Sequence, residues 1–459
     1  MTQYLILLLV MLGVFAAGAF IFKLPIGVAM ASSAVVGTLL AGEGLPVRHF
    51  VEGTFGYFDM ALIIAMAMIF MKSIQASGLL HTLANKIILK LSGRPILLIL
   101  AVMFLIMFPG MISGSSTAAV LTTGALVAPV LISVGIPFNR TGAIIAMGGI
   151  LGMLAPPINI PVMIIGGGID MPYVGFELPL MLISFPLAIV ISLLLSYKYL
   201  KDFDIENIKE ELPVSYHDEY GFKIYLPLII LLVLLVGEKS LPVVFPNMGL
   251  PLIFGISSIF APFTGKTFNY LKKAKEALHD SLGILGILMG VGMFIQIITL
   301  IGVRGYIVNI AVGLPALLFY MGMAIGMPLF GAFSAFGSAS VLGVPFILAL
   351  VGADEIMAGS ALSLFAGLGD LMPPTALAGM FAAQVVGQKN YFKVLRHCYF
   401  PAGLTIIWGL FIILNANRFA EIFKPPLGFL YLLIALIILT VVFTFGLKFY
   451  YSLTNKEGE

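Results

Sequence analysis

Long apolar segments dominate the chain, and short polar segments separate them. A helix needs about 20 apolar residues to cross the hydrocarbon layer of a bilayer, and the chain holds roughly a dozen such runs. The pattern predicts membrane helices at about 3–22, 25–42, 56–76, 94–108, 141–170, 175–200, 224–237, 248–262, 281–301, 354–386, 401–416 and 426–451. The first run lacks a basic n-region and a clear cleavage site, so we expect it to be a retained membrane helix and not a signal peptide.

Two further apolar segments have a different composition. The stretches at about 109–133 and 316–351 are crowded with Gly, Ser, Thr and Pro, which disfavour a straight helix. We therefore predict that each forms a helical hairpin that enters the membrane and returns on the same side.

Basic residues predict how the chain is oriented, because loops rich in Lys and Arg stay in the cytoplasm. If both hairpins are re-entrant, all the basic loops lie on one side of the membrane. The N-terminus is then outside and the C-terminus inside. The residues that carry this argument are Lys86, Lys90, Arg94, Lys198, Lys201, Lys209, Lys223, Lys266, Lys272, Lys273, Lys275, Lys389, Lys393 and Arg396.

The same order of elements occurs twice along the chain. Each half has three helices, an amphipathic surface segment (about 80–91 and 303–313), a hairpin, an interrupted helix and a final helix. The halves are predicted at 1–200 and 224–416, with a cytoplasmic linker at 201–223 and an extra helix at about 426–451. The predicted topology makes the repeat inverted, which is typical of secondary transporters.

Composition narrows the class of protein. Hydrophobic residues make up 61% of the 459 residues, charged residues 10%, and mean hydropathy is +1.13. Soluble domains carry about 25% charged residues, so most of this surface must face membrane lipid. One cysteine and five histidines without clustering predict no disulfide within the chain and no transition-metal site. We expect no cofactor, no nucleic-acid partner and, because no Walker A motif or nucleophile–base arrangement is present, no enzymatic activity.

The first hairpin and the first interrupted helix carry candidate ligands. Ser113, Gly114, Ser115, Ser116 and Thr117 concentrate hydroxyl groups where an unsatisfied polar group costs several kcal/mol. Their hydroxyls and freed carbonyls suit a weakly held Na⁺. A tight contact between helices, built on small residues, is the alternative explanation.

The interrupted helix of the first half runs from Gly149 to the double proline Pro156-Pro157 and then to Asn159. Proline lacks an N–H and breaks a helix, which leaves carbonyls upstream unpaired. Asn159 adds a neutral amide beside the break. The alternative is a kinked structural helix.

The second half repeats this chemistry. Its hairpin carries Ser334, Gly337, Ser338 and Ser340, and its interrupted helix carries Asp370, Pro373, Pro374 and Thr375. An ionisable residue at membrane depth is a functional candidate, so Asp370 could bind Na⁺ or take up a proton. A carboxylate that caps a half-helix is the alternative.

The run at 112–160, with the hairpin at Ser113 to Thr117, Pro129, and the Gly-rich helix ending in Pro156-Pro157, resembles the large membrane subunit of TRAP (tripartite ATP-independent periplasmic) transporters. Gly-Asp-Leu-Met-Pro-Pro at 369–374 resembles the same family in the second half. The resemblance implies a multi-pass protein of the bacterial inner membrane, with a periplasmic N-terminus and a cytoplasmic C-terminus. It also implies an elevator mechanism, an organic-acid substrate, a small four-helix membrane subunit and a periplasmic substrate-binding protein.

The resemblance implies two sites for Na⁺, one in each half, and residues for the substrate beside them. The first cation site draws on Ser113, Gly114, Ser116, Gly149, Pro156 and Asn159, and the second on Ser334, Gly337, Ser338, Asp370, Pro373 and Thr375. The expected substrate residues are Ser115, Thr117, Pro157, Ser340 and Pro374. A stand-alone Na⁺- or H⁺-coupled carboxylate carrier, or a cation/proton antiporter, stays open. An intramembrane enzyme or a structural membrane subunit is a more distant alternative.

Overall fold

The computed structural model describes residues 2–202, 211–240, 245–424 and 427–454. This part of the chain folds into helices joined by loops, and it contains no strand. Nine of its helices are long and apolar enough to cross a membrane. The prediction of an all-α polytopic membrane protein is therefore confirmed.

The first half contains the elements up to α11. They are α1 (Thr2–Ala16), η1 (Ala17–Ile21), α2 (Ile26–Ala41), α3 (Val47–Phe55), α4 (Phe58–Ala76), α5 (Leu79–Leu91), α6 (Pro95–Ser113), α7 (Ser116–Ala119), η2 (Val120–Gly124), α8 (Ala125–Ser133), α9 (Phe138–Leu154), α10 (Ile160–Gly167) and α11 (Glu177–Ser196).

The linker and the second half follow. They contain η3 (Tyr197–Asp202), α13 (His217–Tyr220), η4 (Gly221–Tyr225), α14 (Leu226–Ser240), α15 (Gly249–Ile259), α16 (Ala261–Thr264), α17 (Tyr270–Leu300), α18 (Val303–Gly313), α19 (Ala316–Met321), η5 (Gly322–Gly326), α20 (Met327–Gly331), α21 (Ala335–Ser338), η6 (Ala339–Gly343), α22 (Val344–Ala349), α23 (Glu355–Gly367), η7 (Leu368–Leu371), α24 (Leu377–Val385), α25 (Phe392–Leu414), α26 (Ala416–Ile422) and α27 (Leu427–Thr454).

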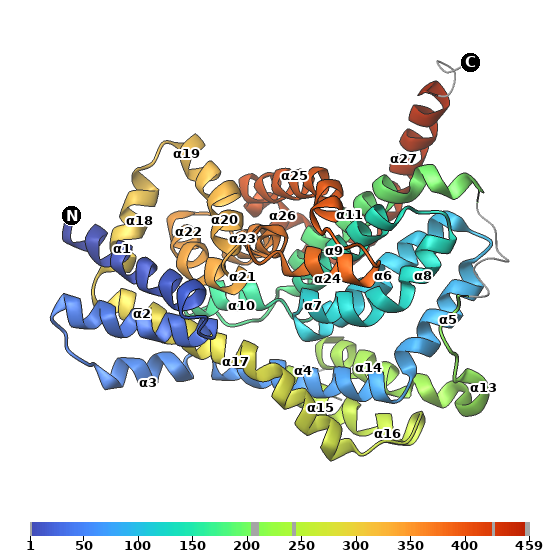
Figure 1. Cartoon of the computed structure of the whole chain (residues 1–459), viewed down its shortest axis with the longest axis horizontal. Coiled ribbons are helices and arrows are strands. Elements are labelled where there is room, and N and C mark those ends of the chain that lie inside the picture. Colours follow the sequence, from blue (N-terminus) through green and yellow to red (C-terminus); the bar gives the residue numbers. More distant parts are fainter. Residues whose placement is uncertain (1, 203–210, 241–244, 425–426, 455–459) are drawn as a thin grey trace.

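The helices form two layers, which Figure 1 shows one above the other. The α17 layer consists of α2, α3, α4, α14, α15 and α17, in which α17 packs against α2, α3 and α4. The hairpin layer consists of α6 to α11 and α19 to α25, in which α9 packs against α6, α11, α24 and α25. The two hairpins and both interrupted helices therefore belong to one layer.

The two predicted surface segments, α5 and α18, connect the layers. α5 packs against α4 on one side and α6 on the other, and α18 packs against α17 and α22. The apolar face of α5 is buried through Leu80, Ala84 and Ile88, and Lys90 is exposed. Each hairpin is thus joined to the α17 layer through a short amphipathic helix.

Two hydrogen bonds also join the layers at the C-terminal end of α10. The Tyr57 hydroxyl donates to the carbonyl of Ile164 at 3.0 Å, and Arg304 donates to the carbonyl of Gly168 at 2.7 Å. The Ile164 carbonyl also accepts from the Gly168 amide at 3.0 Å, so Tyr57 adds a second donor there, from the start of α4, and Arg304 adds a donor to Gly168 from α18. Burial lowers the pKa of the Arg304 guanidinium, which nonetheless remains charged near neutral pH because its ordinary value is above about 12.

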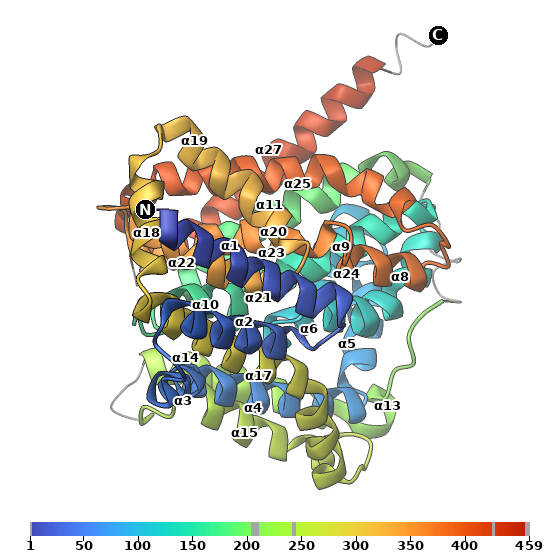
Figure 2. The same ribbon diagram turned by 60° about the vertical axis from the view of Figure 1, so that its left-hand side comes forward.

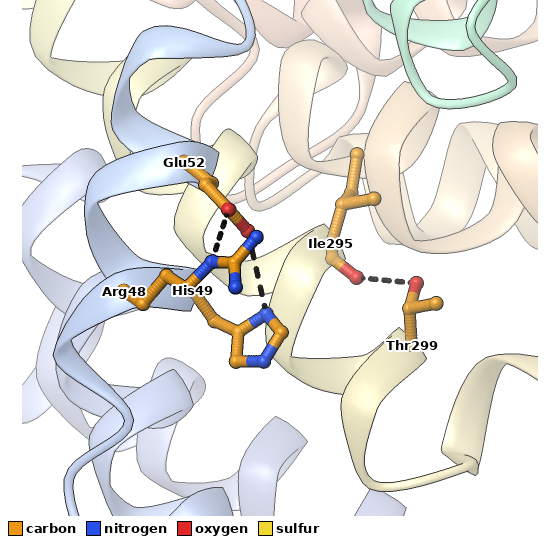
Figure 3. Close-up of polar contacts among 5 residues, drawn as sticks. All are labelled: Arg48, His49, Glu52, Ile295 and Thr299. Atoms are coloured by element: carbon orange, nitrogen blue, oxygen red, sulfur yellow. Dashed lines mark hydrogen bonds and ion pairs between the residues drawn. The ribbon is translucent and has the colours of Figure 1, made fainter.

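Helix α3 is an element that the hydropathy pattern did not predict. Gly53 brings it against α17, because a Cβ at Gly53 would lie 2.6 Å from the carbonyl oxygen of Gly292. Figure 3 shows its polar side chains beside the end of α17: Arg48 donates to Glu52 at 2.7 Å, and His49 lies 3.6 Å from the same carboxylate. These charges pair along one helix and lie outside the hairpin layer.

The first hairpin begins earlier than the sequence suggested. The helix expected at about 94–108 and the first limb of the expected hairpin form one continuous helix, α6, with Pro109 inside it. A proline in a helix removes one backbone hydrogen bond, and here the helix continues for another turn to Ser113. The limbs of the first hairpin are therefore α6 and the continuous run α7–η2–α8.

Part of the predicted linker at 201–223 falls on residues 203–210, outside the described residues. The part that is described packs on α5: Asn85 donates to the carbonyl of Pro213 at 2.8 Å, and the Tyr216 amide donates to Thr82 at 3.1 Å. The ammonium group of Lys266 lies 4.0 Å from the centre of the Tyr216 ring. These contacts attach the segment between the halves to the basic surface helix.

Helix α27 corresponds to the extra helix predicted at about 426–451, although position 426 itself lies outside the described residues. It packs against α11 and then projects away from the other helices, as Figures 1 and 2 both show. Most of its apolar side chains are exposed in the isolated chain. In a membrane, lipid would cover them.

Candidate functional site

Both double prolines interrupt a helix in the hairpin layer. In the first half α9 ends at Leu154 and α10 begins at Ile160; in the second half η7 ends at Leu371 and α24 begins at Leu377. Proline has no N–H, so a carbonyl that would pair with it loses its donor. The two breaks compensate in the same way: Gly152 accepts from the Ala155 amide at 3.2 Å in break 1 (155–159), and Gly369 accepts from the Met372 amide at 2.9 Å in break 2 (372–376).

The tips of the two hairpins are also built alike. In the first, Gly114 turns the chain with φ +64°, and the Ser115 hydroxyl caps α7 by accepting from the Ala118 amide at 3.2 Å. In the second, the Ser334 hydroxyl caps α21 by accepting from the Gly337 amide at 3.1 Å. A π-helical turn follows five residues after each serine. Each tip therefore places a capped helix N-terminus in the interior of the hairpin layer.

Paired glycines let each hairpin cross its own interrupted helix at backbone distance. A Cβ at Gly152 would lie 2.4 Å from the carbonyl oxygen of Met107, and one at Gly110 would lie 2.8 Å from the backbone of Gly152. In the second half, a Cβ at Gly369 would lie 2.5 Å from the backbone of Gly331. No side chain fits at either crossing, so glycine is required there.

Each break also bonds to the tip of the hairpin from its own half. The Ile158 amide donates to the carbonyl of Met111 at 3.2 Å, and the Thr375 hydroxyl donates to the carbonyl of Ala332 at 2.7 Å. The predicted partners within each half are therefore neighbours in the structure.

Two buried polar contacts join the two halves near the breaks. The Ser116 hydroxyl, at the start of α7, donates to the Asp370 carboxylate in η7, and both residues are buried. The Asn159 side-chain amide donates to the Ser363 hydroxyl in α23 at 2.9 Å. The sequence placed Ser116 and Asp370 in different cation sites, whereas the structure brings them into direct contact.

Asn159 has a structural role that accounts for much of its side chain. Its Oδ1 accepts from the Val162 amide at 2.9 Å and so caps α10, while its Nδ2 donates to the carbonyl of Leu154 at 2.9 Å. Together with the bond to Ser363, the Asn159 side chain thus makes three hydrogen bonds that fix the backbone around break 1. The asparagine holds the break in shape more than it offers a free oxygen.

Several other predicted ligands also bond within their own hairpin. The Ser113 hydroxyl donates to Pro109 at 2.6 Å, and the Ser338 hydroxyl donates to Met327 at 2.6 Å. Gly149 lets α9 approach α7, since a Cβ there would lie 2.9 Å from the carbonyl oxygen of Ser116. These three residues shape the site at the hairpins.

The remaining predicted residues differ in exposure. The Ser340 hydroxyl is buried and has no hydrogen-bond partner in the part of the chain that the structure describes, which suits a group that awaits a ligand. Thr117 is half-buried in α7. Pro156 is buried in break 1, whereas Pro373 and Pro374 are exposed in break 2. Break 1 is therefore largely enclosed, with Pro157 half-buried, whereas the double proline of break 2 lies at the surface of the chain.

Four helices begin at the hairpin tips and at the breaks. They are α7, α10, α21 and α24, which lie near the middle of the view in Figure 1. Helix N-termini carry partial positive charge and favour anions, whereas serine hydroxyls, backbone carbonyls and a carboxylate favour a hard cation. No group of three or more His, Cys, Asp or Glu residues that could hold a metal ion occurs within the described ranges.

Sequence reasoning missed Ser363 and Tyr173. Ser363 lies in α23, a mostly apolar helix that also carries Ser360, and only its contact with Asn159, 204 positions away, marks it. Tyr173 lies in the loop between α10 and α11, and its hydroxyl bonds to break 1. Neither belongs to a motif, so no signal in a single sequence marks them.

An all-helical apolar fold, with two proline-broken helices that meet two capped hairpins in the interior, defines a polytopic membrane transport protein. The comparisons with known proteins identify its family. Residues 106–445 match the family described as "Tripartite ATP-independent periplasmic transporter, DctM component". The chain belongs to this family, and is thus the membrane component of a transport system that has other components as well.

Solved structures with the same fold are also transporters. The Alcanivorax borkumensis YdaH transporter superposes with a TM-score of 0.60 at 15% identity, covering 85% of this chain and 98% of its own. MtrF of Neisseria gonorrhoeae, described as one of a class of antimetabolite efflux pumps, superposes with a TM-score of 0.56 at 15% identity, covering 81% of this chain and 83% of its own. At this identity the likeness concerns the fold. No curated protein sequence matches the chain.

Proposed function

We propose that this chain is the transmembrane subunit of a sodium-coupled secondary importer of an organic acid, a dicarboxylate, sialate or similar carboxylate, and that it works by an elevator mechanism. The observation that carries the proposal is the contact between Ser116 and Asp370. It joins a hairpin of one half to the break of the other at a buried position. A buried carboxylate beside a serine hydroxyl and next to a helix break supplies oxygen ligands of the kind that Na⁺ prefers.

The helix N-termini support the proposal that the substrate is an anion. Ser115 and Ser334 cap α7 and α21, and α24 starts at break 2, where Pro373 and Pro374 are exposed. An organic acid that enters from this open side meets the positive ends of half-helices, as anionic substrates of secondary transporters commonly do. A nearby Na⁺ would offset part of the charge of both the substrate and Asp370.

Reciprocal packing supports an inverted repeat. After break 1, α10 packs against α21, η6 and α22 of the second hairpin; after break 2, α24 packs against α7, η2 and α8 of the first. The same exchange occurs in the other layer, where α17 packs against α2 and α4 packs against α15. Each half thus completes the other, which fits two repeats related by a two-fold axis in the membrane plane.

The two-layer arrangement supports an elevator. In that mechanism the hairpin layer moves across the membrane while the α17 layer stays fixed, and α5 and α18 adjust as connecting arms. Phe20 of η1 contacts Phe333 at the second hairpin tip, with ring centroids 4.9 Å apart. In the proposed orientation η1 is the cytoplasmic end of the first membrane helix, and the second hairpin enters the membrane from outside. The contact between Phe20 and Phe333 therefore places the tip of this hairpin close to the cytoplasmic side. This fits a hairpin layer displaced toward the cytoplasm.

Membership of the family supports the proposed partners. We propose that the chain acts in the bacterial inner membrane with a small four-helix membrane subunit and a periplasmic substrate-binding protein that delivers the acid. The basic loops then lie in the cytoplasm, the N-terminus in the periplasm and the C-terminus in the cytoplasm.

Reconstituted uptake tests this proposal. Proteoliposomes that contain the chain would be offered a panel of ¹⁴C-labelled carboxylates, with and without an inward Na⁺ gradient, and with and without a candidate binding protein and a candidate small subunit. We expect uptake of at least one acid only when Na⁺ and both partners are present. Uptake by the chain alone would contradict the tripartite proposal and favour a stand-alone carrier. Uptake driven by a pH gradient without Na⁺ would favour proton coupling through Asp370.

A further inference from the structure

Tyr173 connects the loop after α10 to break 1. Its ring stacks on Phe176 at the start of α11, with centroids 5.1 Å apart and planes inclined by 15°. Phe176 is buried, so the tyrosine is held on a fixed support. This support places the hydroxyl beside the backbone that follows the double proline.

The hydroxyl bonds to two backbone groups of the break at once. It donates to the carbonyl of Pro157 at 3.0 Å and accepts from the amide of Asn159 at 3.2 Å. A phenol can do both because it carries one hydrogen and two lone pairs. The peptide units on either side of Ile158 are therefore fixed in orientation by one side chain. The Pro157 carbonyl is thus occupied by the Tyr173 hydroxyl.

Break 2 shows what the backbone does without such a tyrosine. There the Ala376 amide donates to the carbonyl of Met372 at 2.9 Å and closes the break on itself. Counting from the double prolines, Asn159 and Ala155 occupy the positions of Ala376 and Met372. In break 1 the Asn159 amide bonds to Tyr173, so the Ala155 carbonyl oxygen lacks the amide that closes break 2.

The Ala155 carbonyl is well placed to bind an ion. Ala155 is fully buried and directly follows the end of α9, next to Pro156, which has no N–H to offer. A buried carbonyl without an amide partner carries a desolvation cost that a cation can remove. Backbone carbonyls are also the ligands that replace water around alkali cations in membrane proteins.

We propose that Tyr173 is a positioning residue for the cation site at break 1: by binding the Pro157 carbonyl and the Asn159 amide, it keeps the Ala155 carbonyl free to bind Na⁺. This inference rests on the proposed sodium coupling. Without the hydroxyl, the Asn159 amide is released and the break can close on Ala155 as break 2 closes on Met372.

The test is Tyr173→Phe, which removes the hydroxyl and keeps the ring stacked on Phe176. Three quantities would be measured: the Na⁺ concentration for half-maximal uptake, the KM for the carboxylate at saturating Na⁺, and the melting temperature in detergent with and without Na⁺. Loss of a group that orients a metal ligand typically weakens affinity by at least about tenfold. We therefore expect the half-maximal Na⁺ concentration to rise about tenfold and the stabilisation by Na⁺ to shrink, with KM at saturating Na⁺ changed by less than about twofold.

Tyr270→Phe is the matched control. It removes a hydroxyl that is hydrogen-bonded to Ser258 at 2.7 Å between α15 and α17, within one layer and outside both breaks. We expect it to lower the melting temperature without changing the half-maximal Na⁺ concentration. If Tyr173→Phe behaves like this control, the residue is merely structural and the inference is wrong. If the wild-type protein shows neither Na⁺-dependent uptake nor stabilisation by Na⁺, the proposed function fails, and the inference fails with it.

Discussion

Asp370 and Met153 occupy the same position in the two interrupted helices, one residue after Gly369 and Gly152. The two proposed cation sites would therefore differ chemically, because only the second contributes a carboxylate. The partner of Asp370 is Ser116, from the hairpin of the other half. A buried carboxylate that keeps its charge needs a donor and a cation nearby. The contact supplies the donor, and the proposed Na⁺ supplies the cation.

This contact predicts a coupled loss of function. Asp370→Asn keeps the shape of the side chain and an oxygen that can accept from Ser116, but it removes the charge. We expect it to reduce Na⁺-driven uptake at least about tenfold, because a ligand of the cation is lost. Ser116→Ala removes only the hydroxyl and is expected to have a smaller effect.

The double variant decides whether the two residues act together. Residues in direct contact show non-additive effects, so Ser116→Ala should cost little once Asp370 is already Asn. Thr123→Ser, at a buried hydroxyl that donates to Ile106 in the same hairpin, is the control and should leave uptake nearly unchanged. Independent, additive losses in the double variant would show that Ser116 and Asp370 do not share one site.

At the scale of elements, the sequence predicts what local chemistry determines. The double prolines mark both helix breaks, since proline cannot donate, and the serine-rich stretches mark both hairpin tips, since serine caps helices. The limits of prediction are equally physical. Ser116 and Asp370 are 254 positions apart, and only packing brings them together. Helix α3 was missed because it is short and mixes Arg48 and Glu52 with apolar residues.

The crossings of the hairpins and interrupted helices predict where stability is most sensitive. Gly152→Ala would place a methyl group 2.4 Å from the carbonyl of Met107, and Gly369→Ala would place one 2.5 Å from the backbone of Gly331. Backbone cannot move aside as a flexible side chain can, so each variant should cost about 1–3 kcal/mol. Melting temperature in detergent measures this loss.

Gly283→Ala in α17 is the matched control, because nothing lies within 4 Å of its Cβ position. Alanine favours a helix over glycine by about 1 kcal/mol, so this variant should melt at the same or a higher temperature. Equal melting temperatures for all three variants would contradict the close backbone crossing.

At the scale of the whole molecule, the described helices separate into a layer around α17 and a layer that holds every hairpin and break, as Figures 1 and 2 show. Short amphipathic helices connect the two layers, and Tyr57 of the α17 layer donates a hydrogen bond to α10. In the proposed elevator mechanism the hairpin layer moves as one body on these connecting helices, and the bond from Tyr57 breaks during that movement. The apolar pattern predicted the helices, but it could not predict this division, which depends on contacts between elements far apart in the chain.

Cross-linking tests the proposed movement between layers. Phe20→Cys with Phe333→Cys, in a Cys398→Ser background, joins the end of the first helix to the second hairpin, where the rings are 4.9 Å apart. A short bis-maleimide should trap this state and abolish uptake. The control pair is Phe104→Cys with Phe185→Cys, whose rings are 5.0 Å apart within the hairpin layer. Its cross-link should leave uptake intact, and full uptake with the first pair cross-linked would contradict an elevator.

We propose that Na⁺ and an organic acid cross the membrane together through this chain. The most direct measurement reverses the driving force: proteoliposomes with the complete system receive an inward gradient of the transported carboxylate, equal Na⁺ on both sides, and ²²Na⁺ as tracer outside. While the acid flows in, we expect ²²Na⁺ to accumulate inside the proteoliposomes above its equilibrium level. We expect Asp370→Asn to abolish this accumulation. Inward flow of the acid without any ²²Na⁺ accumulation in the wild-type protein would contradict this proposal.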